Sequence, residues 1–231
     1  MPGELAGLTA AGVVVGVDLV TVPQAMTGRP LVAAFVGGWL MGRPMTGLLA
    51  GVVLELFAFE TLPVGAARYP DWGPPALAAG ALLADGSRPG GAEGVWPGLL
   101  AVVLVAAGVA WLGGWSMHWV RRANGVAIAR AADRLDAGDP RALIRLQAGG
   151  FVRDVVRAAA LTLVALVPGG AVARLLTAAW RAPAGLAEDV VLGAALGVAA
   201  WSAWRSFGRG RPARWLAAGL ALGSVGALLW G

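Results

Sequence analysis

The sequence predicts an all-α, polytopic integral membrane protein, and three observations support this fold class. Of the 231 residues, 58% are hydrophobic and only 13% are charged, whereas soluble domains have about half apolar and about a quarter charged residues. The mean hydropathy is +0.72. Apolar stretches of membrane-spanning length recur along the chain. This composition excludes a water-soluble globular enzyme and a disordered chain.

The apolar stretches differ in length, and the differences predict different elements. A spanning helix needs roughly 20 apolar residues, and this length is met at 5–22, 95–117, 158–180 and 186–204, with 215–230 slightly short. Stretch 31–59 instead forms two short arms, 31–41 and 45–59, that meet at Gly42-Arg43-Pro44, and 76–84 is shorter still. Such Gly/Pro-broken arms are typical of re-entrant hairpins, although two ordinary helices joined by a tight turn fit equally well. We expect about five to seven membrane segments.

The charges between these stretches predict an orientation. Residues 121–157 hold eight Arg against four Asp, and 205–214 hold four Arg and no acid. The intervening stretches 61–94 and 181–189 each carry a net charge of −1. Because cytoplasmic loops are enriched in cations, we expect 121–157 and 205–214 to be cytoplasmic. Stretch 123–146 is too charged to span and predicts a helix broken at Gly138-Asp139-Pro140, where Asp can cap a new helix and Pro can begin it.

Several classes of protein are excluded by what the chain lacks. There is no Cys and only one His, and Ser116 lies two positions from His118, so the two face apart on a helix. No enzyme centre, metal site or cofactor site is therefore predicted. The sequence pI is near 11.3, but the Arg residues lie between apolar blocks, which indicates membrane orientation and not nucleic-acid binding. The first four residues carry no cation, so we do not expect a signal peptide.

Polar groups inside apolar stretches are the candidate functional residues, because an intramembrane charge is costly and usually has a functional reason. Glu55 lies within the second short arm. Its carboxylate can accept hydrogen bonds from hydroxyl groups of a ligand, form a structural ion pair with Arg29 or Arg43, or relay a proton. Gln24 carries a donor and an acceptor on one amide, which also suits hydroxyl recognition. Arg29, before Pro30, opens the first arm.

The same region resembles a known family. The resemblance is carried by Pro23-Gln24-Ala25-Met26-Thr27-Gly28-Arg29-Pro30-Leu31-Val32, by Gly38 to Gly42, by Met45-Thr46-Gly47 through Leu54-Glu55-Leu56, and by Gly65-Ala66-Ala67 with Pro70-Asp71. Together they resemble the IIC subunit of the mannose/sorbose-type phosphotransferase system. The later run from Arg122 and Asn124 to Ala131-Ala132-Asp133 and Gly138-Asp139 is similar to the charged central helix of that family. One departure is at the hairpin tip, where the family's Gly-Asp is Gly42-Arg43 here.

The resemblance implies a single IIC-like membrane domain over residues 1–231, with a hairpin region at 23–71 and a cytoplasmic connector at 121–157. It implies a permease subunit of a PEP-dependent sugar phosphotransferase system, which translocates a hexose or amino sugar for phosphorylation by a cytoplasmic IIB protein. Such a subunit is not itself an enzyme and needs no cofactor, since its partners transfer the phosphoryl group. Gln24 and Glu55 are the first candidates for binding the sugar, and Arg29 and Asp71 are weaker candidates that orient the hairpins.

The resemblance also implies partners and a location. The partners are a IID-like membrane subunit, the IIA and IIB phosphocarriers, the sugar and the lipid bilayer of the bacterial cytoplasmic membrane, in a higher-order oligomer without nucleic acid. Four cations of the connector either dock the cytoplasmic partner or only fix the orientation; they are Arg130, Arg134, Arg141 and Arg145. Two alternatives stay open, a transporter that works without phosphorylation and a non-transporting scaffold or sensor, to which the charge reversal at Arg43 points.

Overall fold

The computed structural model describes residues 2–18, 24–59, 69–86, 95–181 and 183–207, together with 214, 218 and 219. All regular structure in these ranges is helical, which confirms the predicted fold class. The helices are α1 (Pro2–Asp18), α2 (Pro30–Leu40), α3 (Pro44–Ala58), α4 (Gly73–Gly86), α5 (Val95–Arg130), α6 (Ala132–Asp136), α7 (Pro140–Leu166), α8 (Pro168–Ala179) and α9 (Ala184–Phe207). The predicted segment 215–230 lies almost wholly outside the described residues.

Helices α2 and α3 form the hairpin that the two short arms predict. Pro30 and Pro44 stand at the helix starts, where a missing backbone N–H costs nothing and the fixed φ suits the helix. The connecting turn passes through Gly42, whose φ of 76° lies in the left-handed region that glycine adopts readily. Whether this hairpin crosses the bilayer or re-enters it stays a prediction.

Glycines bring the backbones of this hairpin into contact. A Cβ atom on Gly38 would lie 2.6 Å from the Cα of Gly47, and one on Gly51 would lie 2.9 Å from the Cα of Leu31. Helix α4 packs against both arms, and its residues 76–81 are almost completely buried. Small residues of this kind allow close helix packing in membranes. Helices α2, α3 and α4 therefore form a densely packed body, and the polar residues of the hairpin lie beside it.

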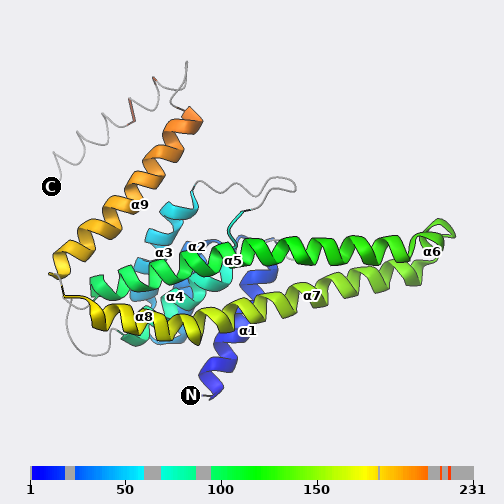
Figure 1. Cartoon of the computed structure of the whole chain (residues 1–231), viewed down its shortest axis with the longest axis horizontal. Helices are drawn as coiled ribbons and strands as arrows, with labels where there is room; N and C mark the ends of the chain where they lie inside the picture. Colours follow the sequence, from blue (N-terminus) through cyan, green and yellow to red (C-terminus); the bar gives the residue numbers. More distant parts are fainter. Residues whose placement is uncertain are drawn as a thin grey trace.

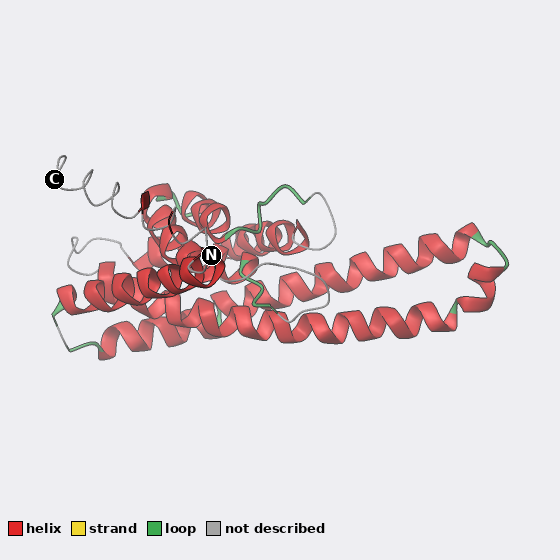
Figure 2. Ribbon diagram, turned by 90° about the horizontal axis from the view of Figure 1, so that it is seen from above, coloured by secondary structure: helices red, strands yellow, loops and turns green. Residues whose placement is uncertain are grey.

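Helices α5 and α7 run side by side as two long rods that extend beyond this body to α6 at their tip (Figures 1 and 2). With 36 residues, α5 is about 54 Å long, which exceeds the hydrocarbon core of a bilayer. At the tip Gly138 has a φ of 71°, and Asp139 Oδ1 accepts a hydrogen bond from the N–H of Arg141 at 2.9 Å. This cap, with Pro140 beginning α7, confirms the predicted helix break.

Two boundaries differ from the sequence-based expectation. The apolar stretch 95–117 continues without interruption into charged residues as far as Arg130, in one helix. The stretch 158–180 is divided at Val167-Pro168 between α7 and α8. Proline lacks the N–H for the helical ladder and its ring clashes with the preceding turn, which accounts for this break inside an otherwise continuous apolar run.

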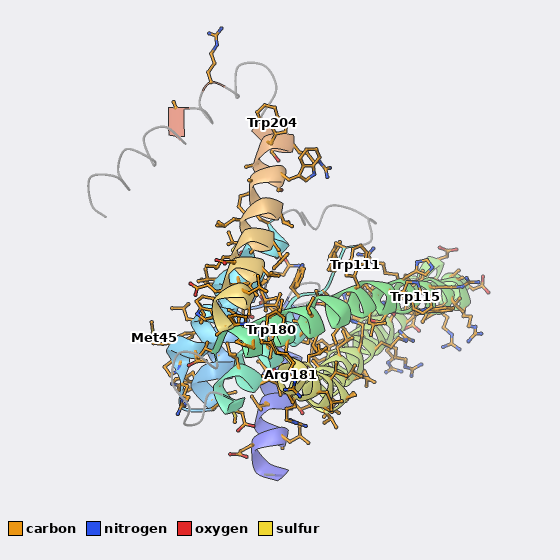
Figure 3. All side chains as sticks on the ribbon, turned by 60° about the vertical axis from the view of Figure 1, so that its left-hand side comes forward. Met45, Trp111, Trp115, Trp180, Arg181 and Trp204 are labelled. Atoms are coloured by element: carbon orange, nitrogen blue, oxygen red, sulfur yellow. The ribbon has the colours of Figure 1, made fainter. Side chains whose placement is uncertain are left out.

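The described residues include three helical stretches that are long and apolar enough to cross a membrane, and two shorter apolar helices. The three are Val95–Arg130, Pro140–Ala179 and Ala184–Ser206, and the shorter ones are α2 and α3. Trp111 and Trp115 on α5 and Trp204 on α9 are labelled in Figure 3, and all three are more than half exposed. Exposed Trp side chains on such helices are typical of membrane proteins, in which they gather at the interfaces.

Candidate functional site

The loop before α2 is fastened to α1 by a buried carboxylate. Asp18, the last described residue of α1, accepts hydrogen bonds from the N–H of Ala25 at 2.7 Å and from the N–H of Gly28 at 3.2 Å. Gln24 lies in the same loop with an exposed side chain and a left-handed φ of 58°. Acceptance of two backbone N–H bonds by one carboxylate fixes the path of the loop relative to α1.

The loop ends at Arg29, which forms an ion pair with Glu55 of α3 through Nη2 and Oε1. The other oxygen of Glu55, Oε2, accepts the N–H of Leu31 at 3.1 Å. That N–H belongs to the first turn of α2, where backbone donors have no partner within the helix and a negative charge is favourable. Glu55 thus caps α2 from the neighbouring helix and holds the guanidinium of Arg29 beside it.

This pair is accessible and is not saturated. The side chains of Arg29 and Glu55 are 41% and 23% exposed. An ionised carboxylate has about four acceptor sites and a guanidinium has five donors, and the ion pair with the bond to the N–H of Leu31 occupies only part of them. A ligand with several hydroxyl groups can therefore bind here by accepting from the guanidinium and donating to the carboxylate, with the exposed amide of Gln24 nearby in the chain.

A second ionic cluster lies in the interior. Asp71 Oδ2 is 2.5 Å from Arg157 Nη1, and the same guanidinium is 3.0 Å from Oδ1 of Asp154, one helical turn earlier on α7. The N–H of Asp71 donates to the carbonyl of Ala110 on α5 at 2.9 Å. The absence of a side chain at Gly113 makes room for this segment, because a Cβ there would lie 2.8 Å from Asp71 Cβ. The cluster joins the segment before α4 to both long helices.

The predicted substrate residues therefore divide into two groups. Arg29 and Glu55 are paired at the start of α2 and Gln24 lies in the loop before it, whereas the carboxylate of Asp71 is only 2% exposed and is bound to Arg157. The structural ion pair considered for Glu55 is present, with Arg29 as the partner. Sequence reasoning assigned no role to Asp18 or Arg157, although Asp18 is a charge inside the apolar stretch 5–22 and Arg157 directly precedes the apolar stretch that begins at 158. In the described residues, no three His, Cys, Asp or Glu side chains are grouped to hold a metal ion.

The four predicted docking cations lie on the distal part of the α5–α7 pair. Arg130, Arg134, Arg141 and Arg145 are all exposed. The space between α5 and α7 holds an open groove of about 850 Å³, with a mostly apolar lining that includes Ile128, Leu143 and Phe151. Two arginines at this groove, Arg121 and Arg153, are distinct from the predicted four, and Arg153 donates to the Oδ1 of Asn124 at 2.7 Å.

Comparison with known proteins agrees with this architecture. The family model of the phosphotransferase system sorbose-specific IIC component matches residues 5–200. The chain belongs to this family. As a IIC chain with several apolar helices it is a multi-pass membrane protein, and the resemblance seen in the sequence is confirmed.

Individual relatives extend the comparison. The IIC chain is 42% identical over 48 residues to the sorbose-specific EIIC component of Lacticaseibacillus casei, a match that covers 21% of this chain and 17% of that protein. Among solved structures, a membrane protein has a TM-score of 0.72 at 20% identity and covers 99% of this chain and 94% of its own. A chain from the complex of the mannose transporter ManYZ with microcin E492 has a TM-score of 0.62 at 18% identity, covering 100% and 88%. At these identities the two structures support the fold alone.

Proposed function

We propose that the IIC chain is the sugar-translocating membrane subunit of a PEP-dependent phosphotransferase system, which takes a hexose or amino sugar for phosphorylation by a cytoplasmic IIB protein. The observation that carries this proposal is the partly exposed Arg29–Glu55 pair at the start of α2. A neutral hydroxyl group forms a stronger hydrogen bond with a charged donor or acceptor than with a neutral one. Their position beside a Gly/Pro-broken helical hairpin agrees with the way transporters build substrate sites from short, interrupted helices.

Within this site the residues have different roles. Glu55 and Gln24 bind sugar hydroxyls directly, and Arg29 donates through the guanidinium N–H groups that Glu55 does not use. Asp71 acts from the interior, because its bond to Arg157 keeps the segment before α4 against α7 and so orients the hairpin region 23–71 as part of one domain over residues 1–231.

The partners follow from the family and from the charge distribution. We assign a IID-like membrane subunit, in keeping with the likeness in fold to a chain of the ManYZ complex, and IIA and IIB phosphocarriers. The exposed arginines at 130, 134, 141 and 145 form the docking surface for the cytoplasmic partner. Their positive charge also favours the cytoplasmic side, in a bacterial cytoplasmic membrane, with the subunits gathered in a higher-order oligomer.

The test is a pair of matched substitutions, Glu55→Gln and Glu188→Gln, in membranes that also contain the IID-like partner. Glu188 is a partly buried carboxylate near the start of α9 and has no part in the Arg29–Glu55 pair. Loss of a charged hydrogen-bond acceptor should weaken binding of labelled mannose, glucosamine, galactosamine or sorbose about tenfold or more in the first variant and leave it unchanged in the second. Equal amounts of inserted protein are the control.

The outcomes separate the alternatives. Saturable binding by the natural chain that Glu55→Gln weakens supports the permease, and unchanged binding removes Glu55 from the site. A natural chain that purifies without a IID-like partner and binds none of the four sugars would move the function to a scaffold or sensor.

A further inference from the structure

Asp18 is a buried residue whose hydrogen bonds connect it to the loop of the proposed sugar site. It is 2% exposed, and a carboxylate in apolar surroundings is costly unless its oxygens are hydrogen-bonded. Both oxygens are bonded here, Oδ1 to the N–H of Ala25 at 2.7 Å and Oδ2 to the N–H of Gly28 at 3.2 Å. One side chain of α1 therefore holds the loop before α2 at two points.

Around these two points the loop has a conformation that its own residues do not favour. Met26, between them, has a φ of 62°, and Gln24, just before the first, has a φ of 58°. Left-handed backbone is costly for residues other than Gly and Asn and persists where the surroundings impose it. The side chain of Met26 is 74% exposed, so its packing does not impose the conformation. The interactions that hold this backbone are the two hydrogen bonds that Asp18 accepts and a third that the carbonyl of Met26 accepts from the N–H of Arg29 at 3.1 Å.

The described part of this loop, residues 24–29, begins at Gln24 and ends at Arg29, and both residues belong to the proposed sugar site. We infer that Asp18 is a positioning residue for the sugar site, which acts by fixing the backbone from which these two side chains reach the ligand. The inference rests on the proposed function and adds to it a residue that does not touch the sugar. This role gives a reason for a carboxylate in an apolar helix at a position where it bonds to backbone N–H groups.

The first experiment is Asp18→Asn, with Asp189→Asn as the control at an exposed carboxylate of α9. Asn presents an N–H donor where one carboxylate oxygen now accepts, so one of the two loop bonds is lost. Uptake is measured in membranes with the IID-like partner, using whichever labelled sugar the natural chain binds. The KM for uptake should rise about tenfold, which is the effect expected from the loss of one hydrogen bond to a charged group. The maximal rate and the amount of inserted protein should stay unchanged, and Asp189→Asn should have no effect.

A second pair of variants tests the mechanism with Asp18 intact or replaced. Met26→Val places a β-branched side chain in the left-handed region, where it is strongly disfavoured, whereas Met26→Asn places the residue type most enriched there. Met26→Val should raise the KM about as much as Asp18→Asn, and Met26→Asn should lower the KM of the Asp18→Asn variant about threefold. Neither change removes a buried contact, because the Met26 side chain is exposed.

Each result decides the inference. A KM unchanged by Asp18→Asn, or a fall in maximal rate and inserted protein that Met26→Asn does not reverse, overturns it, since a merely structural residue behaves in this way. If Asp18→Asn does not insert, equal KM values for Met26→Val and Met26→Asn overturn it and unequal values support it. Failure of the natural chain to bind any of the four sugars contradicts the proposed function instead.

Discussion

Two arginine–carboxylate clusters in the described part of this IIC chain differ in what surrounds them. At the start of α2, Arg29 and Glu55 are 41% and 23% exposed, whereas Arg157 and Asp71 in the interior are 4% and 2% exposed. The same pair of chemical groups therefore has two uses. Solvent and a ligand can reach the first pair, so its free donors and acceptors are available for binding. The second pair is sealed between helices, so its contribution is to the fold.

The neighbouring elements explain this difference. Arg157 and Asp154 are on a long helix that packs against α1, α4 and α5, and Asp71 reaches them because Gly113 of α5 leaves space for its segment. Glu55 lies near the end of α3, is partly exposed, and bonds to residues at the start of α2. A cluster enclosed by several helices loses access to water, and one at the edge of a two-helix hairpin retains it.

The largest effect should follow from breaking the interior cluster with Arg157→Met. The change leaves the carboxylates of Asp71 and Asp154 buried without their shared cation, and removal of one partner of a buried pair costs about 3–5 kcal/mol. We expect little folded protein and a much lower thermal midpoint in detergent. The measurement is the yield of monodisperse protein with its thermal unfolding curve.

The control replaces all three charges at once, with Asp71→Asn and Asp154→Asn added to Arg157→Met. Apolar or neutral replacement of a whole buried ion cluster is often tolerated, so the triple variant should recover much of the lost stability. A single variant as stable as the natural chain would contradict a structural role for the cluster.

A smaller effect, confined to binding, should follow from Arg29→Lys. Lysine keeps the charge but lacks the planar fork that can contact a carboxylate and a ligand together, so the sugar affinity should fall about fivefold to tenfold with no change in unfolding. The control is Arg122→Lys at an exposed position of α5. A loss of stability as large as that of Arg157→Met would remove the contrast between the two clusters, as would an unchanged affinity.

The contrast also shows what could be predicted from the sequence. The fold class, the hairpin at 31–59 and the helix break at Gly138 depend on composition and on local Gly, Pro and Asp signals, and the structure has all three. The partner of Glu55 could not be chosen, because Arg29 and Arg43 were both suitable and the pairing with Arg29 spans 26 residues. No local pattern carries that information.

Longer-range contacts were harder still. Arg157 lies 86 residues from Asp71 in the sequence. The role of Asp18 depends on hydrogen bonds to backbone N–H groups, and these cannot be predicted from the types of the residues that carry them. The helix boundaries at Arg130 and Pro168 were missed for a different reason. Hydropathy ends a predicted span where charges begin, whereas the helix ladder of α5 continues through charged residues and that of α7 stops at a proline.

The smallest effect should follow from neutralising the distal arginines of the α5–α7 pair, in a variant with Arg130→Gln, Arg134→Gln, Arg141→Gln and Arg145→Gln. All four are exposed, and exposed charges at an interface act mainly on the association rate and its salt dependence. We expect a few-fold weaker capture of the IIB partner at low salt, and no difference at high salt, where screening removes the attraction. Sugar binding should not change.

The matched control for this variant removes negative charge, in place of positive charge, from the same surface. Asp133→Asn with Asp136→Asn removes two exposed acids of α6 and should make IIB capture slightly tighter at low salt. If the arginines only fix the orientation of the chain in the membrane, both variants will capture IIB equally well at every salt concentration, and the docking surface must then be sought elsewhere, beginning with the apolar groove lined by Ile128, Leu143 and Phe151.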